Sequence, residues 1–137
     1  MKDTLAKGLT TKRRVAIDKD RTIGYMGEEL RVYATPWMAR DIELTCRDMV
    51  FENLDDGEDS VGARIEVDHL GATLVNSWVD VTATVVDVDG RRVTLEIEVV
   101  DPLDVVGKAR HVRFVIDKER QRARLEAKAA KLKEVGG

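Results

Sequence analysis

The chain has 137 residues, of which 43% are hydrophobic and 36% are charged. A chain of this length suits one core, so we predict a single domain over residues 1–137, with its core at about 10–117. The 23 Lys and Arg residues stand against 26 Asp and Glu residues, a net charge of -3. This balance gives no indication of a nucleic-acid or membrane-surface partner.

The cysteine content and the hydropathy pattern exclude two further classes. The single cysteine, Cys46, cannot form a disulfide within the chain, and one cysteine with two histidines cannot complete a zinc cluster. No apolar run approaches the roughly 18 residues of a membrane span. We therefore expect a cytoplasmic protein without a metal site.

The first half of the chain predicts a weak strand over 13–17, a loop over 18–30 and a strong helix over 33–51. Thr35 followed by Pro36 is typical of a helix start, where the threonine oxygen caps the first turn. One apolar stripe recurs at helical spacing: Met38, Ile42, Thr45, Cys46 and Met49.

From residue 60 the period changes to two, and four antiparallel strands are predicted. The first places Val61, Ala63, Ile65, Val67 and His69 on the face toward the helix. Two more strands run through 79–85 and 93–99, with an Asp-Gly turn at 87–90. The last alternates Val112, Phe114 and Ile116 with His111, Arg113 and Val115. A surface helix follows over 118–134, with Leu125, Ala129 and Leu132 in a narrow stripe.

This order of elements predicts an α+β fold, in which an antiparallel sheet wraps around one central helix and an extra helix ends the chain. One helix leaves strand edges or part of a sheet face uncovered. Pairing with a second copy is the ordinary remedy. We therefore expect a homodimer, and the sequence leaves a higher oligomer open.

Histidine chemistry in this chain must come from His69 or His111. His69 ends a strand on the face that the helix covers, where it is either a titrating group or a core ring bonded to the backbone. His111 shares its face with Arg113, opposite the apolar residues of the same strand, and is expected to face solvent. Cys46 lies on the helix stripe and is expected to be an inert core thiol.

The combination of segments is more specific than any single residue. VYATPWMARDIELTCRDM followed by SVGARIEVDHLGAT resembles the hot-dog-fold thioesterases of the fluoroacetyl-CoA thioesterase-like family. VVDVDGRRVTLEIEV and GKARHVRFVI resemble the last strands of that family. The resemblance runs from about residue 10 to 118 and leaves the last helix outside.

The resemblance implies hydrolysis of an acyl-CoA thioester to a carboxylate and coenzyme A, with no other cofactor. The threonine, glutamate and histidine of the family match Thr35, Glu43 and His69, which become the candidate catalytic residues. Arg113 and Pro36 become candidate substrate-binding residues. Pro36 departs from the family pattern, as do the charged residues before the helix, Glu28 and Glu29, so the acyl group stays open.

Helix geometry adds a constraint. Thr35 and Glu43 are eight residues apart, so they lie roughly 12 Å apart along one helix and cannot touch. Two helices that run antiparallel across a dimer interface would bring one subunit's helix start near Glu43 of the other. We therefore predict two composite sites per dimer, each with a helix N-terminus suited to polarising a thioester carbonyl.

Two other functions remain open at this point. The first is a hot-dog domain that binds acyl-CoA or a related ligand without hydrolysing it. The second is a structural dimerisation domain, in which Thr35 is only a cap, Glu43 a solvated helix residue and His69 a core ring. A hot-dog hydratase is disfavoured because the chain lacks the paired Asp and His that such enzymes use.

Overall fold

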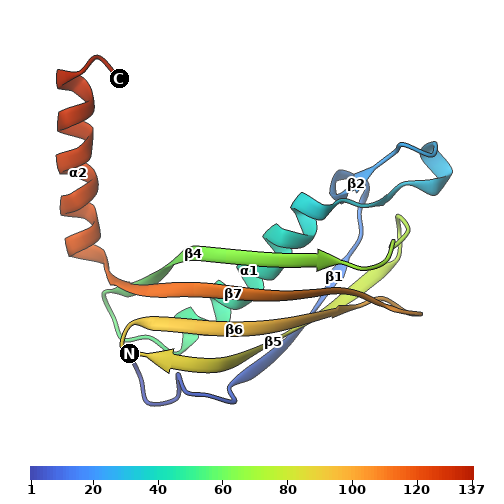
Figure 1. Cartoon of the computed structure of the whole chain (residues 1–137), viewed down its shortest axis with the longest axis horizontal. Helices are drawn as coiled ribbons and strands as arrows, with labels where there is room; N and C mark the ends of the chain where they lie inside the picture. Colours follow the sequence, from blue (N-terminus) through green and yellow to red (C-terminus); the bar gives the residue numbers. More distant parts are fainter.

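A computed structural model, which describes all of residues 1–137, shows a curved sheet with one helix across it and a second helix standing apart (Figure 1). The strands are β1 (Thr10–Ala16), β2 (Thr22–Ile23), β3 (Val32–Tyr33), β4 (Glu58–His69), β5 (Trp78–Asp89), β6 (Arg92–Val100) and β7 (Val105–Asp117). The helices are α1 (Thr35–Glu52) and α2 (Lys118–Glu134).

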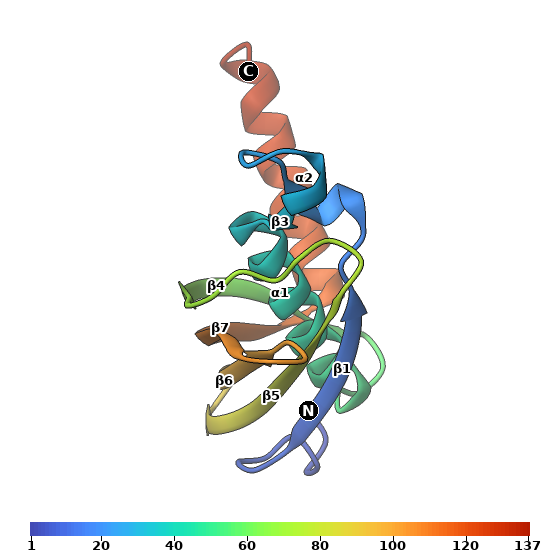
Figure 2. The ribbon, with the colours of Figure 1, turned by 90° about the vertical axis from the view of Figure 1, so that its right-hand side faces the viewer.

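Five strands form one antiparallel sheet in the order β1-β5-β6-β7-β4. Helix α1 lies across one face of this sheet, as the view turned by 90° shows (Figure 2). The predicted α+β arrangement is confirmed. Strand β4 is an edge of the sheet, with only β7 as a neighbour, so its other side carries backbone groups free for another strand.

The core lies between α1 and the concave face of the sheet. The apolar stripe of α1 supplies Met38, Ile42 and Cys46, each fully buried. The sheet supplies inward residues at alternate positions of its central strands: Val79, Val81, Val93, Leu95 and Val99. Strands β5 and β6 pack one face on the core and turn the other outward, so apolar and polar residues alternate along them and both strands are predicted well.

The predicted loop over 18–30 contains more structure than expected. Strands β2 and β3 pair antiparallel over two residues each and form, with the turn between them, a small flap beside the start of α1. We call residues 18–33 the flap. A two-residue strand shows no alternation, so the sequence pattern could not reveal it.

Strand β4 follows the prediction over half its length. Ile65, Val67 and His69 point toward the helix side and are partly buried, as expected. Val61 is instead 38% exposed on the outer face, because a bulge between Gly62 and Arg64 adds one residue and reverses the alternation before it. Gly62 therefore faces the helix, contrary to the prediction.

The faces of β7 are the reverse of those that apolar alternation suggested. His111 and Arg113 point into the protein and are only 1% and 3% exposed, whereas Phe114 lies on the outer face and is 41% exposed. The prediction that His111 faces solvent is wrong. Alternation shows which residues share a face of a strand, but both faces of β7 mix apolar and polar residues. Hydrophobicity alone therefore predicted the wrong face as the buried one.

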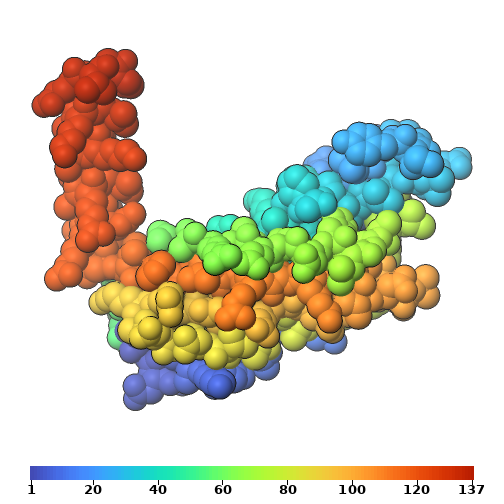
Figure 3. Space-filling model, viewed as in Figure 1, coloured from blue at the N-terminus to red at the C-terminus, as the bar shows by residue number.

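Helix α2 matches its predicted bounds and has no buried residue. Asp117 caps it by accepting a hydrogen bond from the Arg120 amide at 3.0 Å. The helix leaves the body at the end of β7 and projects past the β4 edge (Figures 1 and 3). No helix of the protein is both long and apolar enough to cross a membrane.

Candidate active site

The start of α1 brings two of the predicted catalytic residues together. The Thr35 hydroxyl lies 2.7 Å from Nδ1 of His69, a hydrogen bond that joins the first helical residue to the last residue of β4. The contact spans 34 residues of sequence, and it exists because α1 begins where the edge strand ends.

Thr35 does not cap the helix, so that prediction is wrong. Ala34 occupies the cap position, and no side chain there accepts a hydrogen bond from the first turn. Pro36, exposed beside Thr35, has no amide hydrogen to offer. The amino end of α1 therefore keeps its partial positive charge without a side-chain acceptor, and the Thr35 hydroxyl is committed to His69.

His69 is held in a state suited to accepting a proton. Its ring meets Tyr33 edge to face, with 6.3 Å between the ring centroids. Burial lowers the pKa of His69, while a hydrogen bond with the Gly71 backbone acts in the opposite direction. The neutral ring is therefore favoured at pH 7, and a neutral ring has one nitrogen able to accept the Thr35 proton.

A buried carboxylate that the sequence did not single out braces this end of the protein. Asp41 is 4% exposed and accepts two hydrogen bonds from the Arg21 guanidinium, at 2.9 and 3.2 Å, and one from the Tyr33 hydroxyl at 2.5 Å. Burial and the Asp41 carboxylate raise the pKa of Tyr33. Asp41 thus ties the flap to α1 and positions the ring that contacts His69. The sequence signal for this role was the position of Asp41, an acidic residue next to the apolar stripe of the helix.

Glu43 belongs to a second cluster, centred on the buried Arg113. The Glu43 Oε1 atom lies 3.7 Å from Nη1 of Arg113, and its side chain is 49% exposed. Two further bonds hold the guanidinium: Nε donates to the Ser60 hydroxyl at 2.7 Å, and Nη2 donates to the Ser60 carbonyl at 2.9 Å. Burial lowers the pKa of Arg113 and the Glu43 charge raises it.

His111 completes this cluster in one tautomer. Its Nδ1 lies 2.8 Å from the Arg64 carbonyl, which can only accept, so Nδ1 carries the proton. Its Nε2 lies 3.1 Å from Nη1 of Arg113, which can only donate, so Nε2 is the acceptor. Burial lowers the pKa of His111 and favours this neutral form. The ring is a support for Arg113.

Gly62 leaves space in front of this cluster. A Cβ atom at position 62 would stand 3.3 Å from Oε1 of Glu43, 3.4 Å from Cε1 of His111 and 3.5 Å from Nη1 of Arg113. The bulge in β4 creates this position by turning Gly62 inward. The sequence signal was a glycine inside an alternating strand, which often marks a bulge or a close backbone approach.

The candidate residues therefore form two separate groups within one chain. His69 meets Thr35 at the start of α1, whereas Arg113 of β7 meets Glu43 two turns further along the helix, and no hydrogen bond or ion pair joins the two groups. Cys46 belongs to neither: it is fully buried, and burial raises the pKa of its thiol to about 12. The predicted position of Cys46 in the core is confirmed.

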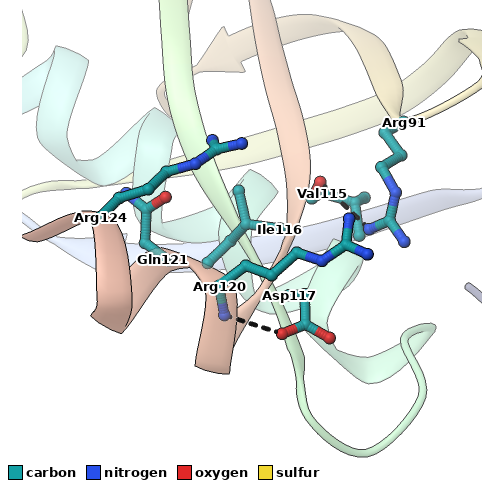
Figure 4. Close-up of a pocket in the computed structure, with 7 residues that line it drawn as sticks. All are labelled: Arg91, Val115, Ile116, Asp117, Arg120, Gln121 and Arg124. Atoms are coloured by element: carbon teal, nitrogen blue, oxygen red, sulfur yellow. Dashed lines mark hydrogen bonds between the residues drawn. The ribbon is translucent and has the colours of Figure 1, made fainter.

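A small basic hollow elsewhere is not part of this chemistry. It holds about 120 Å³ at the foot of α2, with Arg91, Arg120 and Arg124 around it and Asp117 among them (Figure 4). The hollow lies at the Asp117 end of β7. In the antiparallel pairing of β7 with β4, His69 lies opposite Gly107, at the other end of these strands. Neither group of candidate residues contributes to the lining of the hollow.

Comparisons with known proteins agree with this architecture. Residues 17–119 match the family model described as fluoroacetyl-CoA-specific thioesterase. A fluoroacetyl-CoA thioesterase from Streptantibioticus cattleyicolor is 30% identical over 135 residues, which cover 93% of this chain and 97% of the relative.

Solved structures give the same result. A point mutant of the fluoroacetyl-CoA-specific thioesterase FlK, in complex with fluoroacetate and CoA, is 29% identical and superposes with a TM-score of 0.75, covering 83% of this chain and 97% of that one. A hot-dog-like protein from Thermanaerovibrio acidaminovorans, 23% identical, shares the fold with a TM-score of 0.83 over 92% of this chain and 96% of its own. The chain therefore belongs to the fluoroacetyl-CoA-specific thioesterase family and is a thioester hydrolase of hot-dog fold.

Proposed function

We propose that the protein hydrolyses acyl-CoA thioesters at two composite sites in a homodimer, each with Thr35 and His69 from one subunit and Glu43 from the other. The observation that carries this proposal is the division of the candidate residues into two half-sites within one chain. Antiparallel pairing of the exposed β4 edges would place the His69 end of one strand beside the Gly62 end of the other. Glu43 lies against Gly62 and would then face the partner's His69.

Each residue has a role that its surroundings support. The uncapped start of α1 would receive the developing negative charge on the thioester oxygen, beside the Thr35 hydroxyl. His69, neutral at pH 7, would accept and return a proton through Nδ1. Glu43, oriented by Arg113, would attack the carbonyl carbon or activate the water that does so.

The reaction balances with these groups alone. Water adds to the carbonyl carbon, the carbon-sulfur bond breaks, and coenzyme A leaves as a thiolate that needs no strong acid to depart. A direct attack by Glu43 would form an anhydride that water then cleaves, and the net products are the same. Coenzyme A enters only as part of the substrate, so we propose no cofactor. The single free cysteine and this substrate fit a cytoplasmic enzyme.

The test is complementation between two inactive chains. A His69→Ala chain and a Glu43→Gln chain, carrying different tags, are co-expressed, and the heterodimer is isolated by two affinity steps. In the composite arrangement it contains one intact site, so its thiol-release rate should be about half that of wild type. Each variant alone should release almost no thiol. If the residues act within one chain, the heterodimer has no intact site and stays inactive, which would overturn the proposal.

A further inference from the structure

The exposed stripe of α2 has no partner within its own chain. Leu125 is 57% exposed and Leu132 is 44% exposed, and both lie on one helical face with Ala129. The helix is 17 residues long, about 25 Å, yet no residue of it is buried. A helix of this length that buries no residue gains little stability, because most helical stability in proteins comes from packing an apolar face.

The direction of α2 shows where a partner could lie. The helix starts beside the β4 edge, where the Lys118 amide donates to the Gly57 carbonyl at 2.9 Å. It then extends beyond that edge, and so does the flap at the other end of the strand (Figures 1 and 2). An open groove of about 590 Å³ separates its stripe from the sheet, with Leu125 and Ala129 on one side and Val61 of β4 and Ile116 of β7 on the other.

The opposite end of the molecule carries a complementary surface. Large exposed apolar side chains cluster on the flap and on the two loops next to it: Tyr25, Met26, Leu30, Leu70, Leu74 and Leu103. The connector 70–74 is joined to the flap by a bridge between Val32 and Leu74 and by the Tyr33 amide, which donates to the Thr73 carbonyl at 2.8 Å. We call this connector and the flap together the end cap of the protein.

The proposed two-fold pairing brings these two surfaces together. If Gly62 of one β4 lies near His69 of the other, the chain beyond His69 of the partner enters the space next to Val61. That space is the open groove under the α2 stripe. The partner residues that arrive there belong to the connector 70–74, with the flap behind it.

Charge favours the same contact. Lys118–Glu134 contains seven basic and three acidic residues, whereas the rest of the chain has 16 basic and 23 acidic residues. Exposed acids lie on and beside the end cap: Glu29 on the flap and Asp68 just before the connector are exposed, and Glu28 is exposed but pairs with Lys19 and Arg31 of the flap. A basic helix and an acidic body attract each other between subunits as well as within one.

We propose that α2 is an intersubunit arm, whose apolar stripe packs on the end cap of the partner. The contact holds the flap of the partner over the Thr35 and His69 of that same partner subunit. The occupant of the groove is thus a second copy of this chain. The proposal rests on the composite dimer described above. It assigns to α2, which buries no residue in its own chain, a part in shaping the site of the neighbouring subunit.

Photo-crosslinking of the full-length protein tests the arm. Leu132→p-benzoylphenylalanine places a short-range crosslinker on the stripe, and Ala127→p-benzoylphenylalanine places it on the opposite face as a control. After irradiation, we expect a covalent dimer band only for the first variant, with the crosslinked peptide mapping to 24–31 or 70–74. Light scattering on the same samples reports the oligomeric state before irradiation.

The possible outcomes distinguish a failure of the arm proposal from a failure of the proposed function. A dimer in light scattering with crosslinks only inside one chain, or with none, overturns the arm and leaves the composite site intact. A monomer in light scattering overturns both. As a second readout, Leu125→Glu with Leu132→Glu should make backbone amides of 24–31 exchange hydrogen about tenfold faster in a protein that remains dimeric, whereas Ala127→Glu should not. Unchanged exchange in the double variant would also overturn the arm.

Discussion

The Glu43→Gln substitution should separate catalysis from stability. It keeps the shape of the side chain and its oxygen near Arg113, and it removes the charge. The ion pair spans 3.7 Å and Glu43 is 49% exposed, so solvent screens it. We expect the free energy of unfolding to fall by only about 1 kcal/mol, a shift in Tm of about 4 °C for a chain of this size. The catalytic loss should be far larger, about 100-fold or more in kcat, because a neutral amide can neither attack nor take a proton.

The assay follows thiol release from a panel of short and aromatic acyl-CoAs with a thiol reagent. Cys46 gives little background, since its thiol is buried and its pKa is raised to about 12. Glu52→Gln, at the exposed end of the same helix, is the matched control and should keep wild-type rates. A Glu43→Gln enzyme with kcat within threefold of wild type would refute the catalytic role. If the free energy of unfolding fell by several kcal/mol and the dimer dissociated, Glu43 would be a structural residue.

Two further predictions concern the Thr35 end of the site. Burial lowers the pKa of His69, and the proposed mechanism uses its neutral form, so kcat/KM should rise with pH through a midpoint below 6.5 and be flat at pH 7. A midpoint above 6.5 would contradict the assignment. Asp41→Asn removes a buried charge that holds both Arg21 and Tyr33, and should cost about 2 kcal/mol in denaturant unfolding. Asp48→Asn is the control, because Asp48 lies on the same helix but is 40% exposed beside Arg13, and it should lower the free energy of unfolding by less than about 0.5 kcal/mol. Equal losses of unfolding free energy in the two variants would argue against a stabilising role of the buried Asp41.

The sequence by itself determined the elements whose patterns are local. The helix at 35–52 was predictable because its apolar residues recur every three or four positions, and strands β5 and β6 because their residues alternate in burial. Thr35, Glu43 and His69 were identified as candidates through the segments that resemble the family. The eight-residue separation of Thr35 and Glu43 also predicted that these two side chains do not touch within one subunit.

Only the tertiary structure decided which face of β7 is buried and what surrounds Glu43. His111 and Arg113 point inward because the sheet curves around α1 on that side, where Ser60 and Glu43 can pair with the guanidinium. The local pattern of β7 offers no such information, since apolar residues occupy its outer face as well. The bulge that turns Gly62 inward and the contact between Thr35 and His69 depend likewise on how distant segments meet, and the alternation along one strand cannot encode them.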